Sequence, residues 1–312
     1  MATLGGAAKQ ERKSVMSTSP ETTLTLSAET LSHLQSWVGK SEILHDDITA
    51  VALRGLSATL DRDDSAPSAG TPVAPLWHWL YFLPQHRQSE VGPDGHAKRG
   101  GFLPPVPLPR RMWAGGRLSW QAGNPLRVGD AARRVSHIAA VTHKAGRTGD
   151  LLFVLVKHEV HNAQGLCLSE EHDIVYRAAA QSTDPTPAPI AAAPGAPWQR
   201  EVYADDVLLF RYSALTFNGH RIHYDRHYVT SEEGYPGLVV HGPLIATLLL
   251  DLVRRNAPEA RVRSFSFKAV RPTFDQNPLR LNGALQADGK TVQLWAQDHA
   301  GWLTMQGQAE LA

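Results

Sequence analysis

The segment FNGHRIHYD, Phe217 to Asp225, places two histidines and two further polar side chains within one short stretch. His220 and His223 are three residues apart, Asn218 precedes them and Asp225 follows them. Imidazoles at this spacing can bind a metal, transfer protons near neutral pH, or belong to an ordinary polar connection. The context on both sides of the segment has to decide among these three hypotheses.

The metal hypothesis takes His220, His223 and His227 as ligands. Their intervals would suit one face of a helix. The segment instead follows a strand-like run, Val207 to Thr216, and enters a turn at Gly219. Ligands at these intervals on a non-helical segment need not converge, and no HExxH-type pattern accompanies them. We therefore expect no metal.

The acid–base hypothesis draws on the stretch GLVVHGPL, which leads through His241 and Gly242 into an apolar segment. Pro243 at the start of that segment indicates the N-terminus of a helix. A helix N-terminus offers unpaired N–H groups and a positive dipole end, which can stabilise a carbonyl oxygen that gains negative charge. A nearby histidine can transfer protons. Together these groups suit the addition of water to an α,β-unsaturated thioester.

A purely structural role is the alternative for every residue of this region. His227 is most typical of an exposed connection. His241 can cap or pack at the entrance of the helix, and Tyr235 can pack rather than line a pocket.

The bulk properties limit the classes of protein. The 312 residues, 42% of them apolar, suffice for one large or two ordinary domains. A net charge of +1 favours neither a nucleic-acid nor a membrane partner, and the apolar runs are too short to span a bilayer. The single cysteine, Cys167, excludes an internal disulfide and a cysteine-based zinc site. It fits a reducing compartment, so we expect a cytoplasmic protein, or a mitochondrial matrix protein in a eukaryote.

Composition divides the chain into four parts. Residues 1–22 are small and polar and predict a disordered extension. Residues 23–178 and 200–312 form two halves of comparable size. Between them, residues 179–199 are rich in Ala and Pro, which predicts a semi-extended linker.

The two halves share one plan. In the second half, Gly242 to Asn256 predicts a buried helix, because it is apolar on most sides and Pro258 blocks its continuation. In the first half, Ala74 to Pro84 predicts a short apolar helix, and residues 27–60 predict amphipathic helices on the outside. Alternating apolar and polar residues predict the strands: Leu126 to Thr142, Leu151 to Val160 and Leu166 to Arg177 in the first half, and Val262 to Val270, Leu279 to Gln286, Thr291 to Gln297 and Trp302 to Glu310 in the second. An antiparallel sheet wrapped around a central helix, occurring twice, predicts an α+β double hotdog.

The motifs FNGHRIHYD and EGYPGLVVHGPL, with LPRRMWAGGRLSW, KAGRTGDLLFV and DIVYR in the first half, resemble the type 2 hydroxyacyl-thioester dehydratases, which belong to the MaoC-like hydratases. The resemblance extends from about Ser27 to the C-terminus. It implies a hotdog fold, hydro-lyase chemistry, a CoA thioester substrate, and neither a metal nor a redox cofactor. Within the family, the motifs are most similar to those of enzymes that reversibly hydrate a C5-dicarboxylyl enoyl-CoA, such as mesaconyl-C4-CoA or itaconyl-CoA, to a citramalyl-CoA.

The wider group carries an Asp-x-Asn-Pro-x-His motif, whose Asp and His jointly hold and activate the water. His223 matches that histidine, whereas Asn218 takes the place of the aspartate and His220 that of the asparagine. Asn218 cannot transfer a proton. Either His223 is the sole proton carrier, or a nearby carboxylate, Asp225, Glu232 or Glu233, replaces the aspartate. The resemblance favours His223 as the acid–base residue and Asn218 as the holder of the water. Asp225 could orient His223, and the Gly242 N–H could polarise the thioester carbonyl.

A dicarboxylyl substrate needs an arginine for its free carboxylate. Arg221 is favoured because it is near His223 in the sequence, and Arg111 follows because the first repeat of such proteins shapes the acyl pocket. The other candidate substrate contacts are Arg271, His220, His241 and Tyr235.

Three other functions compete with this hypothesis. A dehydratase of fatty acid synthesis would share the motif residues, although the bulky WHWLYFL segment would shorten its acyl tunnel if it faces inward. A hotdog thioesterase would need a carboxylate where Asn218 stands. A non-catalytic acyl-CoA-binding module is the fourth possibility. The sequence leaves open the acyl group, the stereochemistry and the choice between a monomer and a homodimer.

Overall fold

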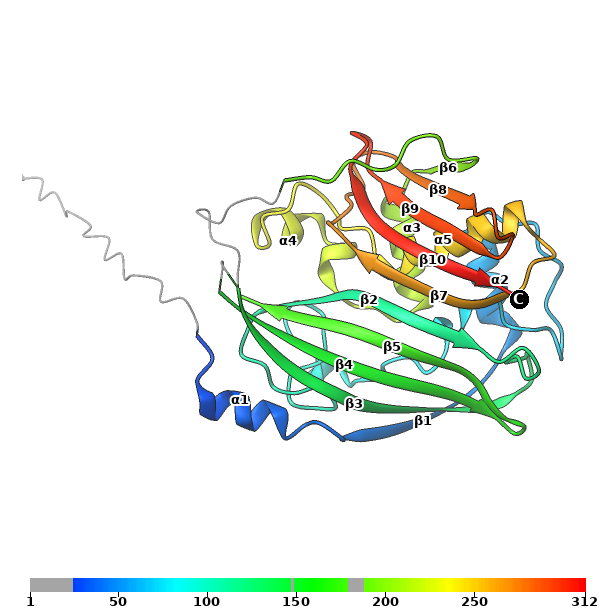
Figure 1. The fold of residues 1–312 in the computed structure, drawn as a ribbon. Helices are drawn as coiled ribbons and strands as arrows, with labels where there is room; N and C mark the ends of the chain where they lie inside the picture. Colours follow the sequence, from blue (N-terminus) through cyan, green and yellow to red (C-terminus); the bar gives the residue numbers. More distant parts are fainter. Residues whose placement is uncertain (1–24, 147–148, 179–187) are drawn as a thin grey trace, which may run out of the picture.

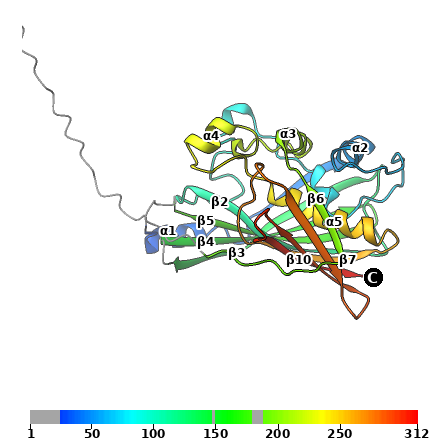
Figure 2. The ribbon, with the colours of Figure 1, turned by 90° about the horizontal axis from the view of Figure 1, so that it is seen from above.

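In the computed structural model, residues 25–146, 149–178 and 188–312 are described. The predicted extension, residues 1–22, and most of the predicted linker lie outside them. Ten antiparallel strands form one continuous, curved sheet in the order β1-β3-β4-β5-β2-β7-β10-β9-β8-β6. The helices α2, α3 and α4 lie together over one face of this sheet (Figures 1 and 2).

The first half contributes five strands and two α-helices, and all five strands lie at one end of the sheet order. Its elements are α1 (Ala28–Gln35), β1 (Ser41–Asp47), α2 (Ala50–Thr59), the 3₁₀ helices η1 (Trp77–Leu80) and η2 (Gln88–Glu90), β2 (Arg110–Trp120), β3 (Ala131–Gly146), β4 (Gly149–Asn162) and β5 (Gly165–Arg177). Buried and partly buried residues alternate along much of β4, as expected for a strand with one face on the core.

The second half contributes the other five strands and three α-helices of the described chain. Its elements are β6 (Trp198–Val202), α3 (Asp206–Leu215), the 3₁₀ helix η3 (Arg221–His223), α4 (Arg226–Ser231), α5 (Gly242–Asn256), β7 (Val262–Ala269), β8 (Leu279–Leu285), β9 (Thr291–Gln297) and β10 (Leu303–Leu311). The predicted helix at Gly242 to Asn256 is confirmed. Ten of its residues are buried, and it packs against β8, β9 and β10.

The two halves join edge to edge where β2 pairs with β7. Gly115 of β2 allows this close approach, because a Cβ atom at this position would lie 2.5 Å from the carbonyl oxygen of Phe267. The two predicted sheets are thus one sheet, and residues of both halves share one large apolar core.

Three local predictions were wrong. The Pro-bracketed segment 74–84 forms only the four-residue helix η1, so a long central helix occurs in the second half and not in the described residues of the first. Residues 27–60 contain the strand β1 between two helices. The strand-like run Val207 to Thr216 is the helix α3, which begins at Asp205, whose side chain accepts a hydrogen bond from the Leu208 N–H.

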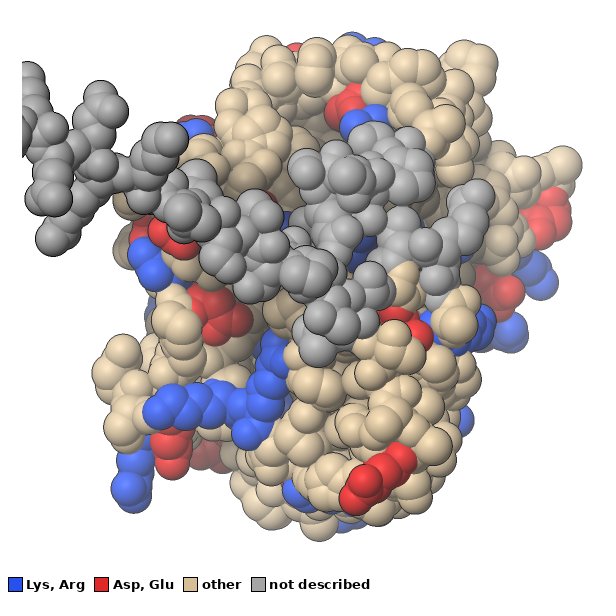
Figure 3. Space-filling view, turned by 90° about the vertical axis from the view of Figure 1, so that its left-hand side faces the viewer, with Lys and Arg blue, Asp and Glu red and all other residues tan. Residues whose placement is uncertain are grey.

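Three further observations concern the predicted linker, the length of the helices and the charge of the surface. The strand β6 begins at Trp198, inside the predicted linker, and the domain boundaries remain a prediction. No helix in the described part of the chain is long and apolar enough to cross a membrane. The face at the left of Figure 1 carries basic and acidic side chains together (Figure 3), in keeping with the small net charge.

Candidate active site

Two stretches of the second half and one loop of the first half meet at the candidate site. The second half supplies the predicted motif after α3 and the N-terminus of α5. The first half supplies the loop at Pro93–His96, whose carbonyl at Asp94 accepts a hydrogen bond from the Arg221 N–H at 2.9 Å. Four imidazoles lie in ring contact here, namely His96, His220, His223 and His241.

The backbone of the motif is held by a side-chain turn. After α3, Phe217 has a positive φ of 49°, which is uncommon for a residue other than glycine. The Asn218 Oδ1 then accepts a hydrogen bond from the His220 N–H at 3.0 Å. This contact leaves the Asn218 amide N–H groups available, so its proposed role as a water holder remains a prediction.

His223 lies at the end of η3, and its ring is fixed in one orientation. Its Nδ1 lies 2.7 Å from the carbonyl oxygen of Val239. A carbonyl oxygen can only accept a hydrogen bond, so Nδ1 carries the proton and Nε2 has a free lone pair. Burial lowers the pKa of His223 to about 4, although the Val239 contact acts in the opposite direction. His223 is therefore a neutral imidazole near pH 7, ready to accept a proton at Nε2.

The ring of His241 packs against the ring of His223. The two rings stack with centroids 3.7 Å apart, and the His241 Nε2 lies 2.9 Å from the Ser213 hydroxyl. Burial lowers the pKa of His241 well below its usual value. Only 1% of His241 is exposed, and its side chain does not cap α5. These contacts account for His241 as a packing residue, and its predicted contact with the substrate remains a prediction.

The Gly242 N–H lies at the N-terminus of α5, next to His241. A Cβ atom at Gly242 would meet nothing within 4 Å, so there is open space beside this backbone. Pro243 has no N–H, which leaves few donors in the first turn of the helix. The geometry is compatible with the predicted polarising role of Gly242, which remains a prediction.

Asp225 does not orient His223, and this prediction was wrong. One of its oxygens accepts a hydrogen bond from the Tyr228 N–H, as the N-cap of α4, and the other accepts from Arg221 at 2.7 Å. The orienting partner of His223 is the Val239 carbonyl instead.

The three candidate arginines differ in their partners. Arg221 pairs with Asp225 and lies over the Tyr228 ring, and Arg271 pairs with Asp298 at 3.4 Å. Both already have an acidic partner, which argues against the prediction that they bind the substrate carboxylate. Arg111 forms no ion pair with an Asp or Glu among the residues that the structure describes.

Arg111 also lies close to the histidines. Burial lowers the pKa of His96, and the positive charge of Arg111 contributes. Burial lowers the pKa of His220 to about 2, and the neighbouring histidines and Arg111 contribute. The charge of Arg111 thus acts on two of the histidines and, unlike Arg221, this arginine has no acidic partner among the described residues.

The remaining predicted contact residues differ in position. His220 packs against His96, with ring centroids 3.9 Å apart. Tyr235 packs against Phe274, and Arg110 lies over its ring, so a structural role accounts for it. His227 is exposed on α4, as expected.

The three histidines of the metal hypothesis that was not favoured, His220, His223 and His227, do not converge, since His227 is exposed while His223 is buried. Within the described ranges, one group of side chains has ligand atoms close enough together for a metal: Asp94, His96 and His220. Sequence reasoning missed Asp94 and His96. The only signal was the stretch GPDGH, an aspartate and a histidine that flank a glycine.

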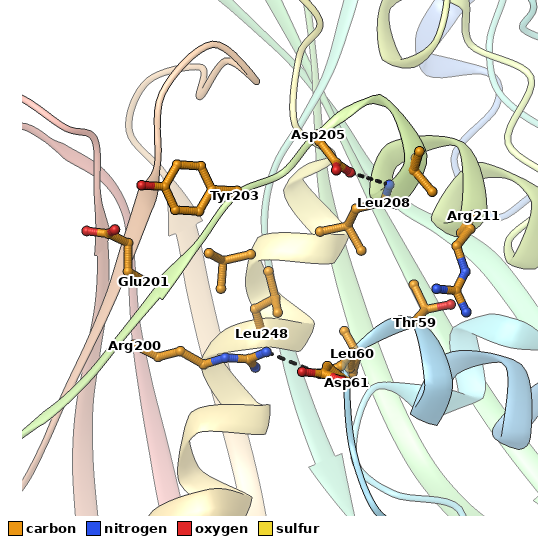
Figure 4. Close-up of a pocket in the computed structure, with 12 residues that line it drawn as sticks. Thr59, Leu60, Asp61, Arg200, Glu201, Tyr203, Asp205, Leu208, Arg211 and Leu248 are labelled. Atoms are coloured by element: carbon orange, nitrogen blue, oxygen red, sulfur yellow. Dashed lines mark hydrogen bonds between the residues drawn. The ribbon is translucent and has the colours of Figure 1, made fainter.

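A separate hollow of ≈ 340 Å³ lies between the end of α2, β6, α3 and α5 (Figure 4). Arg200 donates a hydrogen bond to the Leu60 carbonyl there. None of the predicted site residues lines this hollow.

Comparisons with known proteins agree on the family to which this chain is similar. The family model described as hydroxyacyl-thioester dehydratase type 2 matches residues 76–275. Mesaconyl-C(4)-CoA hydratase of Chloroflexus aurantiacus is 46% identical over 277 residues, which cover 88% of this chain and 97% of that protein. The mitochondrial hydroxyacyl-thioester dehydratase type 2 of Schizosaccharomyces pombe is 26% identical over 254 residues, which cover 72% of this chain and 83% of that protein.

Solved structures share the fold. A MaoC-like dehydratase of Phytophthora capsici superposes with a TM-score of 0.66 at 12% identity, over 90% of this chain and 97% of that one. A Mycobacterium tuberculosis protein described as having a double hotdog fold gives a TM-score of 0.55 at 14% identity, over 88% and 96%. The predicted double hotdog is confirmed.

Proposed function

Because the chain belongs to the type 2 hydroxyacyl-thioester dehydratase family and is a hydro-lyase, we propose that it hydrates a short dicarboxylyl enoyl-CoA. The candidate substrates are mesaconyl-C4-CoA and itaconyl-CoA, and the product is a citramalyl-CoA. The observation that carries the choice of a dicarboxylyl substrate is Arg111, an arginine without an acidic partner in the described chain that lies beside the histidine cluster.

Itaconyl-CoA carries its double bond one carbon further from the thioester and must first shift it into conjugation, which gives mesaconyl-C4-CoA. In the proposed reaction of mesaconyl-C4-CoA, the His223 Nε2 takes a proton from water while the water oxygen bonds to the β-carbon of the substrate. The electrons of the carbon–carbon double bond move toward the thioester and form an enolate, and the Gly242 N–H stabilises its oxygen. His223 then returns the proton to the α-carbon. One water is added in all, and the imidazole ends as it began.

Burial supports this role for His223. A neutral imidazole accepts a proton without first losing one, and the Val239 carbonyl keeps Nδ1 protonated so that Nε2 is the reacting atom. The stacked His241 ring prevents His223 from rotating away from this orientation.

The choice of substrate is tested by turnover of itaconyl-CoA, mesaconyl-C4-CoA and crotonyl-CoA, followed by the mass of the product and, for the conjugated mesaconyl-C4-CoA and crotonyl-CoA, also by the loss of enoyl-thioester absorbance. We expect Arg111→Ala to lower kcat/KM for the dicarboxylyl substrates by about 10- to 100-fold, because a hydrogen bond to a charged group contributes about 1.5–3 kcal/mol. Crotonyl-CoA has no second carboxylate and should be affected little.

Arg110→Ala is the matched control, since Arg110 is the adjacent residue and lies over Tyr235. An equal loss of kcat/KM on all three substrates would show that Arg111 does not bind the second carboxylate of the substrate. Turnover of crotonyl-CoA alone by the wild type would contradict the proposed substrate class.

The pH dependence follows from the lowered pKa of His223. A base with a pKa of about 4 stays unprotonated at every pH well above 4, whereas an ordinary histidine would be protonated below 6.5. We expect the acid limb of kcat/KM for the preferred substrate to lie nearer pH 4 than pH 6.5. An acid limb centred near 6.5 would show that His223 is solvated in the working enzyme or is not the base.

A further inference from the structure

The loop Pro93–His96 is built into the candidate site although it belongs to the first half of the chain. Gly95 has a φ of +89°, and a Cβ atom there would lie 1.8 Å from the Gly219 carbonyl oxygen, so only glycine permits this approach. Two hydrogen bonds from Arg221 hold the loop, one from its backbone N–H to the Asp94 carbonyl and one from its side chain to the Pro93 carbonyl. The loop therefore has a defined position against the motif.

Asp94 and His96 form a carboxylate–imidazole pair in this loop. The His96 Nδ1 lies 3.0 Å from the Asp94 Oδ2, and the Asp94 Oδ1 accepts a hydrogen bond from the His96 backbone N–H at 3.0 Å. Although burial raises it, these hydrogen bonds hold the pKa of Asp94 well below its usual range. An ionised carboxylate can only accept, so the His96 Nδ1 carries the proton and its Nε2 has a free lone pair.

His96 belongs to the same cluster of rings as His223, the predicted base of the reaction. Its ring lies 3.9 Å from His220, whose ring is edge-on to His223 at 5.4 Å. A charge on His96 also affects the pKa of His223, behind the larger effects of burial and of the Val239 contact. With 27% of its side chain exposed, His96 is more accessible than buried His223. Two imidazoles, each fixed with Nε2 unprotonated, thus belong to one cluster.

The motif Phe217–Asp225 lacks a second hydrogen-bond acceptor for the attacking water, and the Asp94–His96 pair would supply one. Asn218 stands where the resembled motif has an aspartate, and its Oδ1 is already bonded to the His220 N–H. Asp225 is bonded to Arg221 and Tyr228. Neither residue provides a second strong acceptor for the water that His223 deprotonates.

We infer that His96, held by Asp94, is a further catalytic residue: its Nε2 accepts a hydrogen bond from the attacking water, while His223 takes the other proton of that water. The inference rests on the proposed hydration and leaves its atom balance unchanged. Water held between two acceptors has its oxygen lone pair fixed toward the β-carbon, which is the orientation that the addition needs. Asp94 is a positioning residue that acts through His96. The first half would then supply part of the catalytic site and not only the acyl pocket.

The test measures kcat and KM of the full-length chain for the substrate that the wild type turns over best, with a chelator present so that a metal on Asp94, His96 and His220 cannot contribute. We expect His96→Leu to lower kcat by about 10²-fold with little change in KM, because the lost contact is to the water and not to the CoA thioester. His96→Gln, whose amide oxygen can accept at a similar reach, should recover part of the loss. His86→Leu, at an exposed position of the same half, is the matched control.

Asp94→Asn tests the positioning role without a change of shape. Its amide can donate to the His96 Nδ1, which favours the tautomer with Nε2 protonated and removes the acceptor. We expect a fall in kcat of at least about 10-fold, again at nearly constant KM. The double variant His96→Leu/His223→Ala should lose much less than the product of the two single losses, since both residues act on one water.

The outcomes separate the inference from the function on which it rests. An inactive wild type would overturn the proposed hydration. An active wild type with kcat unchanged in both His96→Leu and Asp94→Asn would overturn the inference alone. So would an equal loss in His96→Gln and His96→Leu accompanied by a lower melting temperature in both, because that pattern indicates a structural role.

Discussion

Replacing His223 with alanine is expected to lower kcat for enoyl-thioester hydration by about 10²- to 10⁴-fold, the usual contribution of a positioned general base. Its Nε2 has the free lone pair in this ring, because the Val239 carbonyl fixes the proton on Nδ1. Burial keeps the ring neutral at pH 7, so nearly every molecule has the base in its active form.

Two variants separate this loss from damage to the fold. His223→Asn retains a side-chain N–H for the Val239 carbonyl but has no Nε2, and it should be as inactive as His223→Ala. His227→Ala changes an exposed histidine four residues away and should keep wild-type activity. Substantial activity in His223→Asn would contradict the assignment of His223 as the base.

Replacing Asp251 with asparagine is expected to lower the free energy of unfolding by about 3–5 kcal/mol, as when one partner of a buried ion pair is removed. Asp251 lies on α5 with only 1% of its surface exposed. Its carboxylate accepts hydrogen bonds from Arg62 at 2.6 Å, and from Arg200 and Arg255 at 2.7 Å each. Asparagine has the same shape but no charge, so three arginines would lose their common anion.

The hydrogen bonds between Asp251 and these three arginines connect α5 to elements that are distant in the sequence. Arg200 belongs to β6, and both Arg200 and Arg255 also donate to the Leu60 carbonyl at the end of α2. Urea denaturation measures the effect, with Glu259→Ala on the exposed segment after α5 as the control, for which we expect a change within about 0.5 kcal/mol. A loss below about 1 kcal/mol in Asp251→Asn would show that water replaces the carboxylate without cost.

Much of the second half could be predicted from the sequence, because the local sequence patterns there agree with the burial of the side chains in the structure. The helix α5 is apolar on nearly every side, and Pro243 and Pro258 mark its limits. Burial alternates along β7 and β9, and β8, β9 and β10 pack against α5. In α3 the signals disagree: its many Val, Leu, Phe and Tyr residues have strand character, while the cap at Asp205 and the buried stripe of Leu209, Tyr212 and Ser213 belong to a helix.

The site was predictable only within its own segment. His223 follows from the motif, but Arg221 was favoured over Arg111 because it is near in sequence, although it pairs with Asp225 four residues on. Arg111 is more than a hundred residues from the motif. The loop with Asp94 and His96 is similarly remote, and contact between Gly95 and Gly219 brings it to the site. A single sequence does not encode that proximity in any local pattern.

The most direct test of the central claim is the mass of the product formed from itaconyl-CoA and mesaconyl-C4-CoA by the wild type and by His223→Asn, with free thiol measured in parallel. The account predicts a product heavier than the substrate by one water, no release of CoA thiol, and neither change with the variant. Release of CoA thiol without an acyl-CoA product heavier by one water would identify a thioesterase, and an unchanged substrate mass with the wild type would contradict hydration of these dicarboxylyl thioesters.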